Sequence, residues 1–196
     1  MIAALFVETG GVYFGIDGVD PWDIKRNAMQ YRGPHPVVAH PPCQLWGKLA
    51  RVNYKRWGGE HNKPGNDKGM FKFALDCVNT YGGVLEHPAG TYAWGEYDLA
   101  RPEDFRWSPS GDGWVCKVQQ SSYGHKARKT TWLYYCGVLK PFELNWDKTD
   151  AEFQIGFQDQ RGKQHNKPTL TKKEANATPI AFRDELIKLA QYSIKD

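Results

Sequence analysis

The chain has few cysteines, no repeated motif and no low-complexity segment. Its cysteines lie far apart, at Cys43, Cys77, Cys116 and Cys136, and no two of them form a Cys-x-x-Cys pair. This spacing argues against a disulfide-stapled fold and against a zinc ribbon, so we expect a protein of the reducing cytoplasm. Glu8 interrupts the apolar N-terminal stretch and no basic residue precedes it, which predicts a first strand rather than a signal peptide.

Long hydrophobic runs and a strong charge of one sign are also missing. No window approaches the length of a membrane span, so we expect no membrane partner. The net charge of +4 and the pI near 8.8 permit an anionic partner such as DNA without demonstrating one. With 196 residues, the chain is long enough to bury a core, and we expect a single domain over residues 1–196.

What is present is an alternation of apolar strand-like runs with one clear helical pattern. Residues 36–39 and 84–85 are short apolar runs, and residues 70–81 between them place apolar side chains at helical spacing. This order of strand, loop, helix and strand predicts a parallel sheet. Residues 2–7 predict a further strand at the start of the chain.

The second half of the chain predicts a different pairing. Two β-like runs, residues 115–121 and 131–138, are joined by a short connection that favours an antiparallel pair. Thr171 and Glu174 form a capping-box pattern, and residues 179–192 predict a closing helix. The whole chain is therefore predicted to be α/β, with a mostly parallel sheet and a late antiparallel strand pair. This is the architecture of Rossmann-like methyltransferase domains.

The segment His40-Pro41-Pro42-Cys43 is the most informative part of the sequence. Paired prolines fix φ and supply no N–H, so the chain must leave the preceding strand abruptly, with Cys43 at the tip. The carboxyl end of a strand is where α/β proteins place their chemistry. The alternative interpretation of Cys43 is a small apolar residue at a turn.

Three kinds of chemically active group follow predicted strands. Cys43 offers a thiol that can act as a nucleophile, Glu86 offers a carboxyl group that can accept hydrogen bonds or carry a proton, and Arg128 or Lys129 offers a cation for negative charge. Taken singly, Glu86 also fits a solvated acid, and the two cations fit an ordinary charged hairpin. Strand ends that meet at one edge of a sheet would bring all of them together.

Four segments, in the same order, resemble motifs of the DNA cytosine-5 methyltransferases. Residues 41–44, Pro-Pro-Cys-Gln, resemble the catalytic motif, and residues 85–88, Leu-Glu-His-Pro, resemble the Glu-Asn-Val motif. Residues 123–131 are similar to the Tyr-Gly-x-x-Gln-x-Arg-x-Arg segment, with Lys129 at the first Arg. Residues 176–179, Asn-Ala-Thr-Pro, resemble the Gly-Asn-x-Val-Pro motif. The pattern also resembles a group of small phage and prophage proteins.

The resemblance implies a function and a set of site residues. It implies a Rossmann-like methyltransferase that uses S-adenosylmethionine to modify a pyrimidine in DNA or in a nucleotide, in the bacterial host cytoplasm if the chain is phage-encoded. The implied catalytic residues are Cys43, Glu86, Arg128 and Lys129, and the implied substrate-binding residues are Gln44, His87 and His125. The implied cofactor-binding residues are Phe6, Gly10, Gly11, Asp23 and Asn176.

The sequence departs from the family pattern in the cofactor-binding region and in the segment that recognises the target. Glu8 stands where a glycine normally lets the backbone approach the cofactor, and the short interval between Gly11 and Pro42 leaves little room for a strand that frames the adenosine. The family's target recognition domain is missing. Such a core would act on free nucleotides, on DNA with little sequence preference, or with a protein partner that supplies recognition. The basic, glycine-rich residues 48–72 predict a mobile loop that closes over a flipped base.

Two other functions fit the same residues. The first is a nucleic-acid-binding or regulatory protein that keeps the fold but has a degenerate cofactor site. The second is a metal-dependent enzyme, because imidazole and thiolate are preferred zinc ligands and the matched segments carry several of them. Its candidate ligands are His40, Cys43, His87 and His125, although their spacing matches no standard zinc signature.

Overall fold

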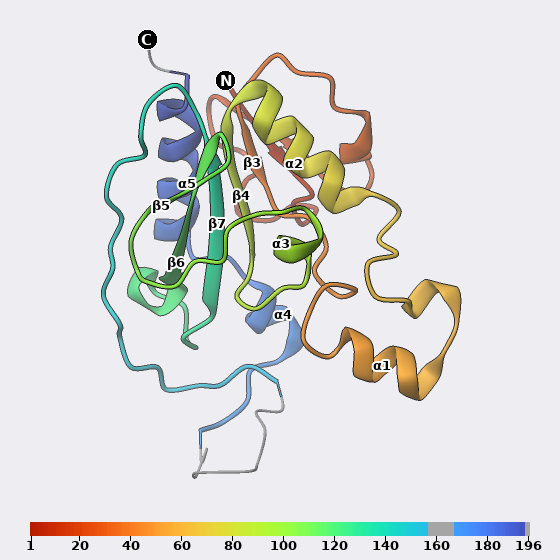
Figure 1. Ribbon diagram of the computed structural model, residues 1–196. Helices are drawn as coiled ribbons and strands as arrows, with labels where there is room; N and C mark the ends of the chain where they lie inside the picture. The colour runs from red at the N-terminus through yellow and green to blue at the C-terminus, as the bar shows by residue number, and fades with distance from the viewer. Residues whose placement is uncertain (157–166, 195–196) are drawn as a thin grey trace.

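A mixed seven-stranded sheet forms the centre of the protein, with helices on both faces (Figure 1). The structure is a computed structural model, and it describes residues 1–156 and 167–194. The strands lie in the order β2-β1-β3-β4-β7-β6-β5. Their bounds are Ile2–Leu5 (β1), Val19–Trp22 (β2), Val37–Ala39 (β3), Gly83–Pro88 (β4), Ser108–Ser110 (β5), Gly113–Gln119 (β6) and Thr130–Cys136 (β7).

The sheet changes direction in its middle. Strands β2, β1, β3 and β4 pair in parallel, whereas β7 runs antiparallel to both β4 and β6, and β5 closes the far edge antiparallel to β6. The α/β class, the parallel half and the late antiparallel pair β6–β7 are confirmed. Strands β2 and β5 were not predicted, because both are short edge strands with a proline and little alternation of apolar residues.

Two helices cover opposite faces of the sheet. Side chains of Ala3 and Leu5 in β1 point to one face, where helix α2 packs, and Ile2 and Ala4 point to the other, where helix α5 packs. Strand β1 is apolar throughout because both of its faces are covered. The α-helices span Ala50–Trp57 (α1), Met70–Tyr81 (α2), Ala93–Glu96 (α3), Lys172–Asn176 (α4) and Ile180–Tyr192 (α5), and the 3-10 helices span Ala28–Gln30 (η1), Glu60–Asn62 (η2) and Gln120–Tyr123 (η3).

Helix α2 has the predicted bounds, and its ends explain why. Asp67 accepts hydrogen bonds from the backbone N–H groups of Gly69 and Phe71 at 2.9 and 2.7 Å, which satisfies the first turn. At the other end Gly82 adopts a φ of +79°, a conformation that favours glycine, and the chain turns directly into β4. The predicted capping box of Thr171 with Glu174 is also confirmed, at the start of α4.

The basic segment of residues 48–72 is more ordered than predicted. It contains helix α1, the turn η2 and the first residues of α2, instead of one mobile loop. Helix α1 projects from the body of the molecule, at the lower right of Figure 1. Every residue from Arg51 to Trp57 in it is exposed, so its apolar positions show no buried face from which a helix could be predicted. Of the described helices, none combines the length and the apolar character that a membrane span requires.

Candidate active site

The carboxyl end of β3 presents Cys43 as predicted. The strand stops at Ala39, His40 donates its backbone N–H to the Leu5 carbonyl at 3.0 Å, and the two prolines follow. The Cys43 carbonyl then accepts the N–H groups of Trp46 and Gly47 at 3.0 and 2.9 Å, which closes a tight turn. Cys43 is half-buried in this turn rather than fully presented.

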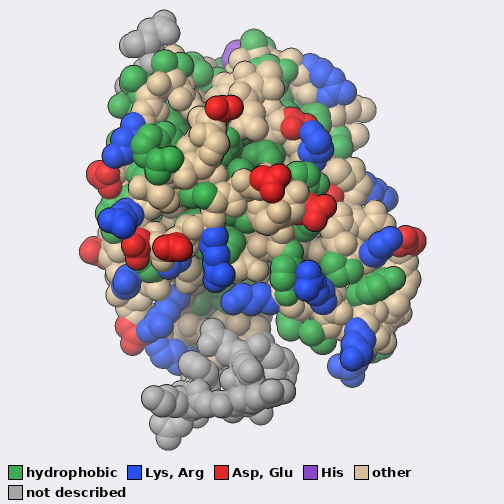
Figure 2. All heavy atoms as spheres, in the orientation of Figure 1, with side chains coloured by type: hydrophobic (Ala, Val, Ile, Leu, Met, Phe, Trp, Pro, Cys, Tyr) green, Lys and Arg blue, Asp and Glu red, His purple; other side chains and the backbone are tan. Residues whose placement is uncertain are grey.

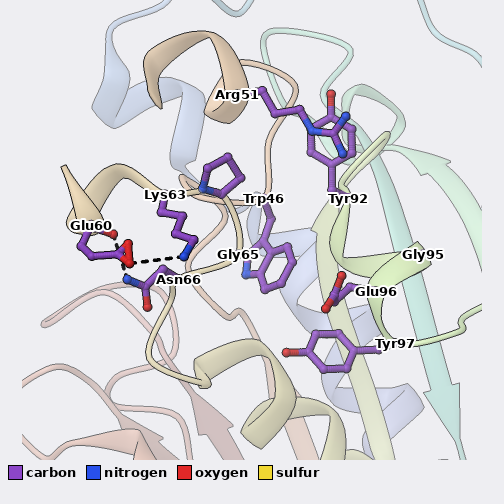
Figure 3. Close-up of a pocket in the computed structure, with 11 residues that line it drawn as sticks. Trp46, Arg51, Glu60, Lys63, Gly65, Asn66, Tyr92, Gly95, Glu96 and Tyr97 are labelled. Atoms are coloured by element: carbon purple, nitrogen blue, oxygen red, sulfur yellow. Dashed lines mark hydrogen bonds and ion pairs between the residues drawn. The ribbon is translucent and has the colours of Figure 1, made fainter. Parts of the chain in front are cut away.

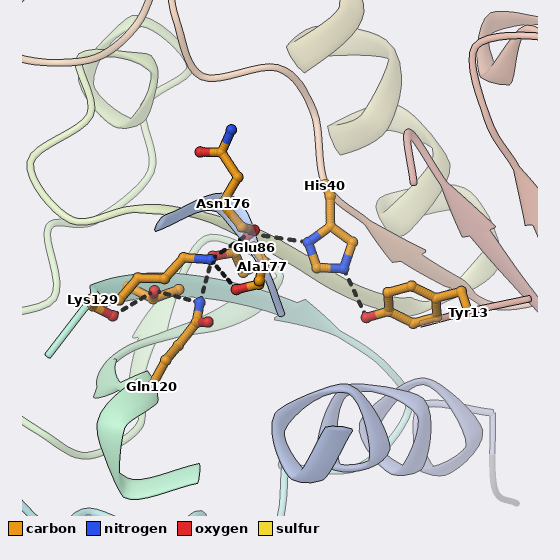
Figure 4. Close-up of polar contacts among 8 residues, drawn as sticks. Tyr13, His40, Glu86, Gln120, Lys129, Asn176 and Ala177 are labelled. Atoms are coloured by element: carbon orange, nitrogen blue, oxygen red, sulfur yellow. Dashed lines mark hydrogen bonds and ion pairs between the residues drawn. The ribbon is translucent and has the colours of Figure 1, made fainter. Parts of the chain in front are cut away.

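Glu86 lies in the middle of β4, and its carboxylate has two hydrogen-bond partners (Figure 4). One carboxylate oxygen lies 3.0 Å from His40 Nδ1, and the other accepts a hydrogen bond from Gln120 Nε2 at 3.1 Å. Burial opposes ionisation of this carboxyl group, but the hydrogen bond and charge of His40, together with the charge of Lys129, lower its pKa to about 2. Glu86 is therefore a carboxylate that accepts hydrogen bonds and does not donate them.

A hydrogen-bonded chain extends from Glu86 on both sides. The Tyr13 hydroxyl lies 2.8 Å from His40 Nε2, and burial together with the charge of Glu86 raises the pKa of Tyr13. The Tyr13 hydroxyl can donate to Nε2 of His40 or accept from it, and in either case Nδ1–H of His40 donates to the Glu86 carboxylate. On the other side, the Gln120 amide also donates to Thr131 Oγ1 at 2.9 Å. The carboxylate is thus fixed in position by His40 and Gln120, which Tyr13 and Thr131 support in turn.

Lys129 supplies the cation of the site. Its ammonium group donates to the backbone carbonyls of Asn176 and Ala177 at 3.0 and 2.8 Å, at the end of α4 (Figure 4). Two of its three N–H donors are used in this way, which leaves one for a ligand. Burial lowers the pKa of Lys129, whereas the nearby Glu86 and Cys43 raise it. The residue has a φ of +39°, so the backbone turns sharply where the side chain enters the site.

Burial and the negative charge of Glu86 raise the pKa of the Cys43 thiol above its usual range. The charge of Lys129 acts in the opposite direction but is weaker. In this state the thiol is protonated at neutral pH, and a nucleophilic role requires that its proton be removed when substrate binds.

These groups share one cavity of about 960 Å³, at the edge of the sheet where β1, β3 and β4 end. Seven of the predicted site residues line this cavity: Phe6, Gly11, Cys43, Gln44, Glu86, Lys129 and Asn176. Sequence segments far apart in the chain thus meet as the parallel strand order predicts. Lys172 and Lys173 on α4 also line the cavity and add positive charge to its rim.

The structure does not bring the remaining predicted residues to the cavity. Arg128 is exposed and pairs with Asp150 at 3.1 Å, because the chain alternates direction along the hairpin and only Lys129 turns inward. His87 is fully buried, with its ring against Phe71 and Trp94, and burial lowers its pKa to about 4. Its alternation with Glu86 along β4 places it on the other face of the strand.

His125, Gly10 and Asp23 also have structural positions outside the cavity lining. His125 Nδ1 lies 2.9 Å from the Ala127 carbonyl and 3.0 Å from its N–H. Asp23 accepts the Thr9 hydroxyl at 2.6 Å and the N–H groups of the next turn, which lower its pKa. The carboxylate predicted to bind the cofactor therefore accepts its hydrogen bonds from groups of the chain itself.

The metal hypothesis is not supported by these positions. Among residues 1–156 and 167–194, no three His, Cys, Asp or Glu side chains are grouped so that they could hold a metal ion. Of the four candidate ligands, only His40 and Cys43 line the cavity, whereas His87 and His125 do not.

Sequence reasoning missed several residues of the site. Tyr13 and Gln120 lie outside every matched segment, and no local pattern marks a residue that reaches a carboxylate from a distant part of the chain. Thr131 is fully buried, and its hydroxyl oxygen accepts a hydrogen bond from the Gln120 amide and so supports Gln120. From the sequence, His40 is a candidate metal ligand only. Its place directly after a strand is the signal that it could contact a carboxylate at the same sheet edge, as it does with Glu86.

Comparison of the chain with protein-family models, with curated proteins and with solved structures found no match in any of the three. The chemistry of the site is therefore argued from its own geometry.

Proposed function

We propose that the protein is a Rossmann-like, cytosine-5-methyltransferase-like enzyme that modifies a pyrimidine in DNA or in a nucleotide. The observation that carries this proposal is the meeting of Cys43, Glu86 and Lys129 in one cavity, from segments whose order resembles that of the family. A thiol, a fixed carboxylate and a cation are the groups that addition to a pyrimidine ring requires. The cavity volume is on the scale of small-molecule sites, which span about 300–1,000 Å³.

In this proposal each side chain has a defined task. Cys43 adds to C6 of the ring as a thiolate, and the proton that its thiol loses passes through Glu86 to N3 of the ring. After the methyl group has joined C5, the C5 proton leaves and the C6–S bond breaks, which restores the aromatic ring and the free cysteine. Glu86, as a carboxylate, accepts a hydrogen bond from the exocyclic amine of cytosine and orients the ring. Negative charge that develops at N3 raises the proton affinity of Glu86, which takes up the proton of the Cys43 thiol and donates it to N3, while the hydrogen bonds from His40 and Gln120 hold the carboxyl group in place. Lys129 attracts negative charge on the ring or on a phosphate.

S-adenosylmethionine is the methyl donor that this reaction needs, and it supplies an electrophilic methyl group when bound. The residues at the end of β1 fit such a ligand in part. Phe6 offers apolar surface, Glu8 offers a carboxylate for hydroxyl or ammonium groups, and Asn176 lines the same cavity. The turn is tight, because a Cβ at Gly11 would lie 2.9 Å from the Glu8 carbonyl oxygen. Phe6, Gly11 and Asn176 would hold the cofactor, whereas Gly10 and Asp23 would not.

A second candidate is a nucleic-acid-binding protein of the same fold without catalysis. The raised pKa of Cys43 favours it, because a thiol that stays protonated is a weak nucleophile. The two candidates differ in whether methyl groups are transferred.

Transfer of a labelled methyl group from S-adenosylmethionine to single-stranded and double-stranded DNA and to dCMP tests the proposal. We expect transfer by the wild-type protein and none by Cys43→Ser, and calorimetry should show that both proteins bind S-adenosylmethionine. Absence of donor binding would contradict the enzyme and favour the non-catalytic candidate, whose cofactor site is degenerate. Donor binding without transfer to any of these substrates would contradict the substrate class proposed here.

A further inference from the structure

A second cavity, of about 610 Å³, adjoins the turn that carries Cys43 and has aromatic walls (Figure 3). Trp46, Tyr92 and Tyr97 line it. The Trp46 indole is held in place, since its N–H donates to the buried Asp67 carboxylate at 2.9 Å. Gly65 packs so closely on this ring that a Cβ there would lie 3.2 Å from it. Tyr92 is 37% exposed, so its ring is available to a ligand.

The charges inside this cavity nearly cancel. Arg51 and Lys63 are its cations and Glu60 and Glu96 its acids, and Lys63 pairs with Glu60 at 3.2 Å. A neutral, aromatic-walled cavity suits a nucleobase better than a phosphate, because every base has a π-face that stacks on aromatic rings. The carboxylate of Glu96 is an acceptor for an N–H group on the edge of a base.

Positive charge surrounds the cavity instead of filling it. Helix α1 carries Arg51, Lys55 and Arg56 and contains no acidic residue. The exposed Trp57 ring lies beneath the Arg56 guanidinium, 4.9 Å from it, and the Arg51 guanidinium lies 4.4 Å from the Tyr92 ring. Figure 2 shows blue basic and green apolar side chains together over α1, at the lower right. Exposed cations beside exposed aromatic rings are the features of surfaces that bind single strands.

The cavity lies one turn of chain away from the candidate nucleophile. The Trp46 N–H donates to the Cys43 carbonyl, and the Tyr92 N–H donates to the Trp46 carbonyl at 2.9 Å. Because the first of these hydrogen bonds closes a turn, the Cα atoms of Cys43 and Trp46 are less than about 7 Å apart. A separation of this size corresponds to one or two nucleotide steps, which measure about 3.4 Å each along a stacked strand.

We propose that this second cavity binds the base of a nucleotide that flanks the target, so that the substrate is a polynucleotide strand and not a free nucleotide. The inference rests on the proposed function for the identity of the target. The flanking base stacks on the exposed ring of Tyr92, beside the wall that the buried Trp46 forms, and the phosphates that join it to the target contact Arg51 and the other cations of α1.

Fluorescence anisotropy with a labelled single-stranded dC dodecamer at low salt tests this proposal. Tyr92→Ala should weaken binding by about 5- to 100-fold, as expected for the loss of one stacked base, whereas Tyr92→Phe should bind as the wild-type protein does. Arg51→Ala should weaken binding and reduce its salt dependence, and Arg106→Ala should not, because exposed Arg106 lines neither cavity. Binding of dCMP should be the same in Tyr92→Ala and wild type.

The test separates this proposal from the proposed function. The binding comparison is repeated in the Cys43→Ser background, where no covalent adduct contributes, and there Tyr92→Ala and Arg51→Ala should weaken dodecamer binding as they do with Cys43 present. Dodecamer binding that Tyr92→Ala and Arg51→Ala leave unchanged would overturn the proposal, whether or not methyl transfer occurs. Failure of the wild-type protein to bind the dodecamer would overturn it as well.

Discussion

The pairing of Glu86 with His40 has a consequence for stability that can be measured without any substrate. The pKa of Glu86 is about 2 in the folded protein and has an ordinary value of 4.5. A lowered pKa means that ionisation of Glu86 stabilises the fold above the unfolded-state pKa, and that this contribution is lost as the pH falls toward the folded-state pKa. The full contribution is about 3 kcal/mol. Between pH 7 and pH 3 about 2 kcal/mol of it should disappear.

Urea unfolding at a series of pH values measures this effect as a difference between two proteins. Glu86→Gln cannot ionise at this position, so its free energy of unfolding should fall by about 2 kcal/mol less than that of wild type between pH 7 and pH 3. Exposed acids titrate equally in both proteins and cancel. Tyr13→Phe is the matched control. It removes a hydroxyl group from the same series of hydrogen bonds but leaves the contact between His40 and Glu86. Equal losses in wild type and Glu86→Gln would refute the reasoning.

Three further outcomes are expected. Glu86→Gln should speed the alkylation of Cys43 by iodoacetamide at pH 8, because removal of the carboxylate charge lowers the pKa of the thiol; a slower reaction would contradict the assigned direction. Lys129→Ala should reduce methyl transfer at least 10-fold while Arg128→Ala changes it less than twofold, and equal effects would show that both cations act in the cavity. Asp67→Ala should destabilise the protein by about 2–4 kcal/mol in urea unfolding, because it leaves Trp46 and the first turn of α2 without their acceptor; a loss below about 1 kcal/mol would argue against that role.

The parts of the fold that the sequence predicts are those with strong local patterns. Helix α2 has regular apolar spacing and a glycine stop, and α4 begins with a capping box, so both start where the pattern places them. Strands β2 and β5 could not be predicted from the sequence. Their own residues have no strand pattern, and they are strands because they form hydrogen bonds with a neighbouring strand. Helix α1 could not be predicted for a related reason. Its apolar side chains Val52 and Trp57 are exposed and are not aligned on a buried face.

The candidate site divides in the same way. Cys43 and Glu86 follow or lie in parallel strands, and parallel order alone brings their segments to one sheet edge. The direction of a side chain in a hairpin depends on the backbone, so the sequence could not tell Lys129, which turns inward at a positive φ, from Arg128, which faces Asp150. The contact of His40 with Glu86 joins two strands through their side chains and required the structure.

The central claim is that Cys43 forms a covalent bond to a pyrimidine ring, and a mechanism-based trap tests it most directly. An oligonucleotide that contains 5-fluorocytosine is incubated with the protein and S-adenosylmethionine, since fluorine at C5 cannot leave as a proton does. Mass spectrometry under denaturing conditions should find an adduct of one protein and one oligonucleotide, linked through the peptide that contains Cys43, and Cys43→Ser should form none. Methyl transfer to the normal oligonucleotide without any adduct on the fluorinated one would contradict the claim.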